Sequence, residues 1–332
     1  MRSRFGCACG SARPEWRGEI APMSEYVIRT DGLTRDFRTN RAVSELSIAV
    51  PRGTIFGFLG PNGSGKTTTI RMLLGLLEPT AGRAEVLGFD VRTQAAEIRK
   101  RSGALLEHHG LYERFRAEDN LDFYARIWGL PAEKRRARIR NLLEKLGLWE
   151  RRKEFVGRWS RGMKQKLAIA RAMLHHPELI FLDEPTAGLD PVAAAALRDD
   201  LVELAAREGV SVFLTTHNLT EAEKMCGQVA VIRQGKLLAV GSPDELRSRN
   251  GPLRAEIVGR GFGPALEQIR LRPEVMAAAV SNGKLSIDLV SNAEVAPIVA
   301  ALVAAGAAIE EVRKGAASLE EVFLTLMEEE QR

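Results

Sequence analysis

A run of glycines followed by a lysine and a hydroxyl is the segment of this sequence best suited to bind an anion. It consists of Gly60-Pro61-Asn62-Gly63-Ser64-Gly65-Lys66-Thr67, with Thr68 next. Glycines let successive backbone N–H groups turn toward one anion, and the Lys66 ammonium can neutralise the outer phosphates of a nucleotide. The Thr67 hydroxyl is a suitable ligand for Mg²⁺. The segment therefore predicts a phosphate-binding P-loop.

Two carboxylates end an apolar run further along the chain, Leu179-Ile180-Phe181-Leu182-Asp183-Glu184. If this run is a strand of a parallel sheet, its carboxyl end faces the ligand crevice. Asp183 can then reach the Mg²⁺ shell, while Glu184 can orient or deprotonate a water molecule. Two acids at the end of a buried strand are costly without such a partner. A lone Asp-Glu pair is otherwise more often a solvated turn.

The elements that must position these groups alternate between strands and helices. Short apolar and β-branched runs predict strands at Ser47–Val50, Ile55–Leu59, Leu179–Leu182, Val210–Thr215 and Val229–Ile232. The P-loop lies between the second of these strands and a helix predicted over Thr68–Leu77, whose N-terminus adds a positive dipole end. The alternation is typical of an α/β domain on a largely parallel sheet.

Composition divides the chain into three parts. Residues 1–24 contain no apolar segment of signal-peptide length, and we expect them to be a disordered extension, with Met1 or Met23 as the true start. Residues 25–250 form the α/β domain, with a helical insertion at about 115–160. Asn250-Gly251-Pro252 marks a boundary. Residues 251–332 predict a small α+β accessory domain with two or three strands.

Three further segments accompany the P-loop and the Asp-Glu strand in a fixed order. Trp159 to Leu167, with the sequence WSRGMKQKL, precedes the strand, while Gly188-Leu189-Asp190 and Thr215-Thr216-His217 follow it. Together they resemble the nucleotide-binding subunit of ABC transporters, because the segment around Ser160 is particular to that family. The resemblance covers roughly residues 26–250. It implies a P-loop NTPase fold of the ABC type that binds and hydrolyses ATP with Mg²⁺.

The resemblance also implies a role for individual residues around the nucleotide. Phe37 falls where the family stacks an aromatic ring on adenine; a core aromatic is the less favoured alternative. Ser160 and Gly162 would open a helix over Met163–Leu174 that faces the γ-phosphate on the opposite subunit. Asp190 would lie at the dimer seam. A complete site would then need two chains, so we expect a homodimer or a pair with a similar ATPase subunit.

The same resemblance assigns the catalytic and metal-binding residues. Lys66 would bind the outer phosphates, Glu184 would act as the base, and His217 would contact the γ-phosphate and the attacking water. Thr67 and Asp183 would hold Mg²⁺. Glu107 occupies the place of the family's coupling Gln; a carboxylate there can accept a hydrogen bond from water or approach Mg²⁺, but it cannot donate one.

Two details are similar to the exporter branch of the family, in which the membrane-spanning permease is a separate chain. They are the Ser-x-Gly-Met form of the signature at Ser160–Met163 and the C-terminal segment Ala317–Leu324. The resemblance implies a peripheral subunit at the cytoplasmic face of the membrane, bound through its permease. The transported substrate is not encoded in this chain, and an importer remains an alternative.

A second class of function is a soluble ABC-type ATPase that acts on nucleic acid or ribosomes. Translation-linked members resemble tandem cassettes, and chromosome-linked members carry long coiled coils between the P-loop and the Asp-Glu strand. Here there is one cassette, and the heptads needed for such a coil are absent between Lys66 and Asp183. We therefore expect no nucleic-acid partner. A non-ABC P-loop kinase would leave Ser160 and His217 without a role.

The positive charge of the chain is local. The net charge of +5 comes from 48 Lys and Arg against 43 Asp and Glu, and residues 134–161 alone hold a net +8. This basic insertion could face an acidic permease helix, anionic headgroups or water. The longest uncharged stretch, Val295–Ile309, has 15 residues, which is too short to span a bilayer. Three cysteines without paired metal spacing fit a reducing compartment.

Overall fold

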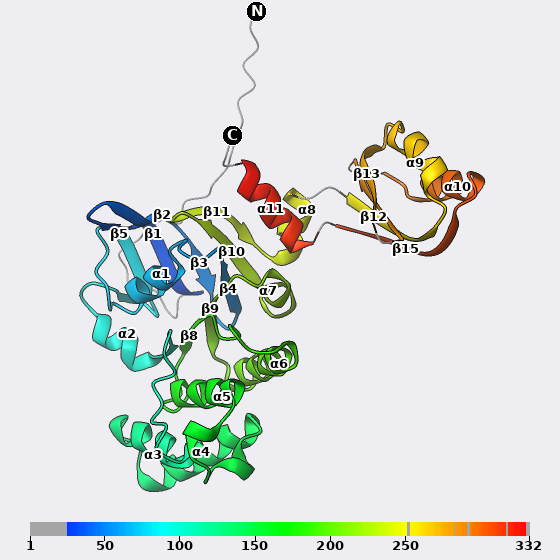
Figure 1. Ribbon diagram of the computed structural model, residues 1–332. Coiled ribbons are helices and arrows are strands. Elements are labelled where there is room, and N and C mark those ends of the chain that lie inside the picture. The colour runs from blue at the N-terminus through cyan, green and yellow to red at the C-terminus, as the bar shows by residue number, and fades with distance from the viewer. Residues whose placement is uncertain (1–24, 251–252, 282, 291–292, 317, 330–332) are drawn as a thin grey trace, which may run out of the picture.

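The computed structural model describes residues 25–250, 253–281, 283–290, 293–316 and 318–329 (Figure 1). The extension 1–24 and part of the boundary at 251–252 lie outside these residues. Within them, the strands form three sheets of six, five and four strands.

The six-stranded sheet contains the strands β4, β8 and β9, whose carboxyl ends lead into the P-loop, Glu184 and His217. Its order is β11-β10-β4-β9-β8-β7, and the strands are β4 (Ile55–Leu59), β7 (Ser102–Leu105), β8 (Leu179–Asp183), β9 (Ser211–Thr216), β10 (Gln228–Arg233) and β11 (Lys236–Gly241). All pairs are parallel except the β10–β11 hairpin. The central strands β8 and β9 are buried along their whole length, as their continuous apolar sequences predict. In register, Thr216 lies opposite Leu59, and Thr215 opposite Asp183.

The second sheet is antiparallel, so the prediction of a largely parallel arrangement holds only for the first sheet. It consists of β1 (Tyr26–Phe37), β2 (Asn40–Leu46), β3 (Ala49–Pro51), β5 (Ala81–Val86) and β6 (Phe89–Asp90). Its strands are rich in charged residues, which hide the strand pattern. β3 begins two residues later than the predicted start at Ser47. This sheet packs on the first through an apolar cluster that includes Phe56, Phe58 and Phe181.

The helix that follows the P-loop, α1 (Lys66–Leu73), ends before the predicted Leu77. Gly75 has φ +61°, and the N–H groups of Leu76 and Leu77 both donate to the Arg71 carbonyl. A glycine with positive φ just beyond the last turn is a common helix stop. The remaining helices on the first sheet are α2 (Ala95–Arg101), α5 (Arg161–Ala172), α6 (Pro191–Glu208) and α7 (Leu219–Met225).

The insertion contains α3 (Ala117–Ile127), α4 (Ala132–Lys145) and two short 3₁₀ turns, Trp149–Arg151 and Val156–Arg158. A carboxylate on α6 fastens it to the rest of the domain. Glu208 accepts hydrogen bonds from Arg138, at 2.8 Å, and from Lys145, at 2.5 Å, and Arg138 also donates to the Met173 carbonyl. Arg138 is therefore a buried structural cation, although the charge count places it in a basic surface.

Replacing Glu208 with alanine should lower the free energy of unfolding by about 3 kcal/mol, because it leaves Arg138 buried without its carboxylate. Glu203→Ala is the matched control: the same helix carries Glu203, but its pair with Arg207 is exposed and should be worth under about 1 kcal/mol. Urea unfolding of both variants measures the difference. Equal losses would contradict a fastening role for Glu208.

The same pair has a predicted pH dependence. Burial alone would raise the pKa of Glu208, but the hydrogen bonds from Lys145 and Arg138 outweigh it and lower the pKa below its ordinary value. The contribution to stability is therefore complete above that ordinary value and is lost as the pH falls through the lowered one. Glu208→Ala should flatten this acid limb of the unfolding curve.

The third sheet forms the C-terminal unit, in the order β13-β14-β12-β15. Its elements are β12 (Leu253–Arg260), α9 (Gly263–Arg270), β13 (Val275–Ser281), β14 (Lys284–Leu289), α10 (Ala296–Ala304) and β15 (Ala308–Ala316), a split β-α-β unit with its own apolar core. Four strands replace the predicted two or three, because β13 is Ala-rich and β15 is highly charged.

The last helix, α11 (Leu319–Glu329), returns to the first domain and lies beside α8 (Pro243–Asn250) in Figure 1. Its start is a capping box, in which Ser318 and Glu321 exchange side-chain and backbone hydrogen bonds. Leu319 and Val322 are fully buried in the core cluster of the first domain. Among the described residues, no helix combines the length and apolarity needed to cross a membrane.

Candidate functional site

The P-loop joins β4 to α1 and turns its backbone toward a cavity. Gly63 and Gly65 have φ values of +79° and +105°, which only glycine adopts easily. A Cβ on Gly65 would lie 2.3 Å from the Ala42 carbonyl oxygen, so no side chain fits there. The Lys66 ammonium donates hydrogen bonds to the carbonyl oxygens of Gly60, at 2.7 Å, and Pro61, at 3.1 Å. This glycine-lined turn forms a cradle for phosphate oxygens.

The Asp183 carboxylate lies directly below this loop and is only 7% exposed. One oxygen accepts a hydrogen bond from the Thr67 hydroxyl at 2.7 Å, and the other accepts one from the Thr215 hydroxyl at 2.5 Å. Carboxylate and hydroxyl oxygens are the ligands that Mg²⁺ prefers. The pair Thr67 and Asp183 therefore fits the predicted magnesium site.

Glu184 follows β8 in an uncommon backbone conformation, with φ +50°. A non-glycine residue in this region is strained, and such strain is concentrated at functional sites. One carboxylate oxygen lies 3.2 Å from the Lys66 ammonium, and the other lies 2.8 Å from Nδ1 of His217. The structure thus brings together Lys66, Glu184 and His217, the three residues predicted to be catalytic.

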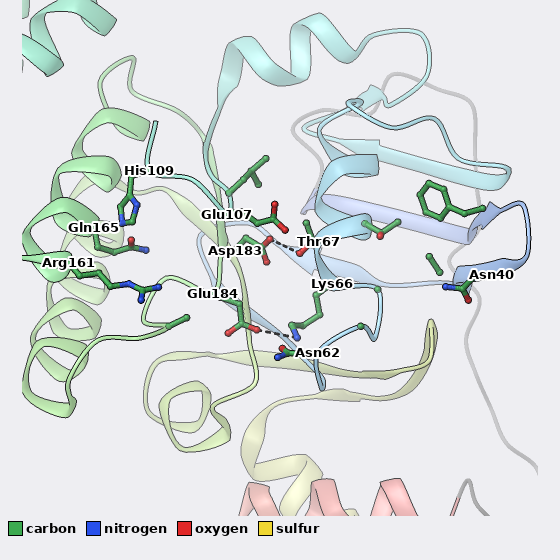
Figure 2. A pocket seen from close by; sticks show the side chains of 17 residues that line it. Asn40, Asn62, Lys66, Thr67, Glu107, His109, Arg161, Gln165, Asp183 and Glu184 are labelled. Atoms are coloured by element: carbon green, nitrogen blue, oxygen red, sulfur yellow. Dashed lines mark hydrogen bonds and ion pairs between the residues drawn. The ribbon is translucent and has the colours of Figure 1, made fainter. Parts of the chain in front are cut away.

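The P-loop, Asp183 and Glu184 border a cavity of about 490 Å³, which is the size of a typical small-ligand site. Figure 2 shows Lys66 pointing toward Glu184 and Thr67 toward Asp183, with His109, Gln165 and Arg161 on the opposite wall. Asn62, Gly63, Gly65 and Thr68 also line it. Ser64 is buried under the loop, where its hydroxyl lies beside Gly60. The cavity, its cradle and its oxygen ligands fit a nucleoside triphosphate with Mg²⁺.

Two predicted residues lie at the rim of the cavity. Phe37 ends β1 and is 41% exposed, with the Arg35 guanidinium 4.6 Å from its ring centroid. This exposure does not fit the alternative interpretation of Phe37 as a core aromatic. Glu107 lines the cavity as well, but its exposed carboxylate pairs with Arg71 at 3.3 Å.

The sequence of this chain is similar to those of known ATP-binding proteins of transporters. The sequence model of the family described as ABC transporter matches residues 43–187. The bacitracin transport ATP-binding protein BcrA of Bacillus licheniformis is 44% identical over 224 residues, 68% of this chain and 72% of that protein. The daunorubicin resistance ATP-binding protein DrrA3 of Streptomyces coeruleorubidus is 36% identical over 312 residues, 93% of this chain and 98% of that protein. This chain belongs to the ABC transporter family of ATP-binding subunits.

Solved structures of ABC transporter subunits share the fold. The cbiO1 subunit from Clostridium perfringens, part of the ABC transporter complex cbiONQ, aligns with a TM-score of 0.64 at 24% identity, covering 75% of this chain and 96% of that one. An ATP-binding subunit of an ABC transporter aligns at 0.60 with 31% identity, covering 67% and 92%. The P-loop fold of mixed α/β class predicted from the sequence is confirmed.

Several residues that the ABC resemblance assigns to the nucleotide do not line this cavity, among them Ser160, Gly162, Asp190 and His217. His217 borders a second cavity, which also touches Glu184. The Ser160 hydroxyl caps α5 by accepting a hydrogen bond from the Met163 amide at 3.3 Å. Asp190 caps α6 in the same manner, through the amides of Val192 and Ala193. Gly162 lies in the first turn of α5, one turn from Gln165, which does line the cavity.

Sequence reasoning missed several cavity residues. His109 belongs to no motif and has no ligand spacing, yet it faces the cavity beside Gln165 and Arg161 (Figure 2). Burial, and then the positive charge of Arg161, lower the pKa of His109 below its ordinary value. Asn40, Ala42, Leu106 and Ala187 also line the cavity without a sequence motif. The one available signal was the position of His109, two residues after Glu107.

Proposed function

We propose that this ABC subunit hydrolyses ATP at a site shared by two ATP-binding subunits, and that this reaction drives export through a separate permease. One observation carries the shared site. The cavity collects the P-loop, Asp183 and Glu184, whereas Ser160 and Asp190 cap helices outside it. The N-termini of helices suit phosphate groups, and the position of these two capping residues outside the cavity of their own chain supports a role across a two-fold interface.

Each residue of the site has a separate role in ATP hydrolysis. The Lys66 ammonium and the P-loop amides neutralise and orient the outer phosphates. Glu184 positions the attacking water and accepts its proton, and His217 donates to the γ-phosphate. Mg²⁺, held by Thr67 and Asp183, would neutralise charge that develops on the β- and γ-phosphates. Glu107, which now pairs with Arg71, is a further acceptor at the rim for a water in the metal shell.

Export is supported by relatives, which carry the names bacitracin transport and daunorubicin resistance ATP-binding proteins. A fluoroquinolones export ATP-binding protein of Mycobacterium tuberculosis is also similar, at 38% identity over 250 residues, 74% of this chain and 81% of that protein. Because the DrrA3 match covers almost the whole chain, it includes the C-terminal unit. We therefore place this chain with a transporter that expels a drug or antibiotic.

The insertion offers a surface for the permease. The ring of Tyr112 contacts those of Phe115 and Phe123, and all three are exposed. Ile127 is exposed four residues after Phe123, and Phe155 is exposed where its backbone pairs with Arg116. Exposed apolar side chains on this scale mark an interaction site. We assign this aromatic surface to a cytoplasmic helix of the permease, which would hold the subunit at the cytoplasmic face of the membrane.

Only some of the basic residues of the insertion are available to bind the permease, because others pair with carboxylates of this chain. Neutralising Arg135, Arg136 and Arg138 together would be a poor test of the interface, because Arg135 pairs with Asp122 and Arg138 is buried against Glu208. The exposed cations of the insertion that have no ion pair within the described residues are Arg116, Lys134, Arg136, Lys153 and Arg158. These five can face acidic groups of the permease or headgroups.

Membrane fractionation of the native cells tests the proposal. The wild-type chain should sediment with the membranes, and Phe123→Ala with Ile127→Ala should release it while the purified variant keeps its ATPase activity. Lys134→Gln with Arg136→Gln shows separately whether the positive charge of the insertion contributes to sedimentation with the membranes.

A Glu184→Gln strain should accumulate at least one of daunorubicin, bacitracin and a fluoroquinolone. Sedimentation with ribosomes and unchanged drug accumulation would instead favour the soluble ATPase.

A further inference from the structure

The two groups that act on the attacking water stand on separate loops. Glu184 follows β8, and His217 follows β9 and precedes α7. Their side chains meet at 2.8 Å, but the His217 side chain is 57% exposed. In hydrolysis, Glu184 must also accept a hydrogen bond from the attacking water, so an exposed contact to His217 is a weak means of fixing the two loops. Another contact must then keep the two loops in register.

Such a contact joins Thr186, two residues after Glu184, to Glu221, four residues after His217. The Thr186 hydroxyl donates a hydrogen bond of 2.6 Å to the Glu221 carboxylate. Glu221 is only 9% exposed. Burying a carboxylate is costly unless it is hydrogen-bonded, and a bond to an ionised acceptor is stronger than a neutral one. The pair borders a second cavity, of about 320 Å³, together with Glu184 and His217.

Both residues of this bond make a further hydrogen bond within their own loop or helix. Thr186 lies in a tight turn, in which its carbonyl accepts a hydrogen bond from the Leu189 amide just before Asp190 caps α6. Glu221 lies in the first turn of α7, where its amide donates to the Asn218 side chain at 3.2 Å.

The helix α7 packs against the C-terminal helix α11 and is paired with α8. Leu319 and Val322 of α11 share its core cluster, and Arg247 of α8 pairs with Glu223 on α7. Movement of Thr186 relative to Glu221 therefore means movement of one loop relative to the other.

We propose that Thr186 and Glu221 are positioning residues that hold the Glu184 loop and the His217 loop at the spacing hydrolysis requires. This inference rests on the proposed ATPase function. Neither residue lines the nucleotide cavity, so the pair can persist while Glu184 and His217 exchange partners. A displacement of about 1 Å at the reacting groups can cost on the order of a hundredfold in rate. The effect should therefore fall on turnover and spare ATP binding.

Thr186→Val tests this, because valine keeps the shape of threonine and removes only the hydroxyl. We expect kcat to fall at least about tenfold, with the Kd for a fluorescent ATP analogue within twofold of wild type. Thr186→Ser keeps the donor and should restore kcat. Glu221→Gln keeps an acceptor of lower strength and should fall between them. The double variant Thr186→Val, Glu221→Gln should be no slower than Thr186→Val alone, since both remove one interaction.

A wild-type kcat in Thr186→Val would overturn the proposal, and so would a Thr186→Ser variant as slow as the valine variant. A purely structural defect is distinguishable, because it would weaken ATP binding together with turnover and leave serine without rescue. If the wild-type chain itself hydrolysed no ATP, the proposed function would fail instead. Thermal melts of each variant confirm that activity is measured on folded protein.

Discussion

Replacing Glu184 with glutamine should remove most ATP turnover and leave ATP binding intact. Glutamine preserves the size of the side chain but cannot take a proton, and loss of a general base typically costs about 10²–10⁴-fold in rate. The Lys66 ammonium, now 3.2 Å from Glu184, would lose a competing anion, so ATP affinity should not fall. Steady-state phosphate release and equilibrium binding of labelled ATP measure the two effects.

Glu178→Gln is a matched control for this variant. Glu178 precedes the other end of β8 and pairs with Arg52 and Arg101, far along the strand from the cavity. Its variant should turn over ATP at the wild-type rate. If Glu184→Gln retained nearly full ATPase activity, Glu184 would not be the base. In ATP, the Glu184→Gln protein should also elute as a dimer in size exclusion with light scattering.

Replacing Lys66 with alanine should abolish ATP binding at physiological concentrations. Its buried ammonium is aligned by Gly60 and Pro61 at the mouth of the cradle. A hydrogen bond to a charged group contributes about 1.5–3 kcal/mol, and two to phosphate oxygens correspond to at least about a hundredfold in affinity. Lys100→Ala, at an exposed position on α2, should bind ATP normally. Wild-type affinity in Lys66→Ala would contradict the assigned role of the P-loop.

The parts of the site that could be predicted are those written in short, local patterns. The P-loop, Asp183 with Glu184, and Thr215 to His217 each lie where a strand meets a loop, and the sequence shows both. The core strands β8 and β9 were found because they are apolar throughout. In the antiparallel strand β1, only the opening run Tyr26-Val27-Ile28 is strand-like in sequence, because arginines, aspartates and bulges interrupt the rest of its pattern.

Other features depend on contacts between distant residues. The exposure of Arg138 cannot be read from its neighbours, because its carboxylate partner Glu208 lies on α6. The bond between Thr186 and Glu221 likewise joins two loops that a charge count or periodicity never places together. His109 gave no motif of its own, and only the folding of the Glu107 loop against α5 turns it toward the cavity.

The central claim is that each complete site combines the P-loop of one copy with the signature segment of another. Lys66→Ala removes the first half of every site. Gly162→Asp removes the second, by placing a negative charge at the start of α5. A Cβ on Gly162 would lie 3.5 Å from Ala193, an ordinary contact, so this variant should fold.

Mixing the two inactive proteins tests the claim directly. Half of the randomly formed dimers pair unlike copies, and each of these holds one intact site. The mixture should therefore recover up to about a quarter of the wild-type ATPase rate, while each variant alone stays inactive. A mixture as inactive as its components, or full activity in Gly162→Asp alone, would show that the site does not depend on a second copy.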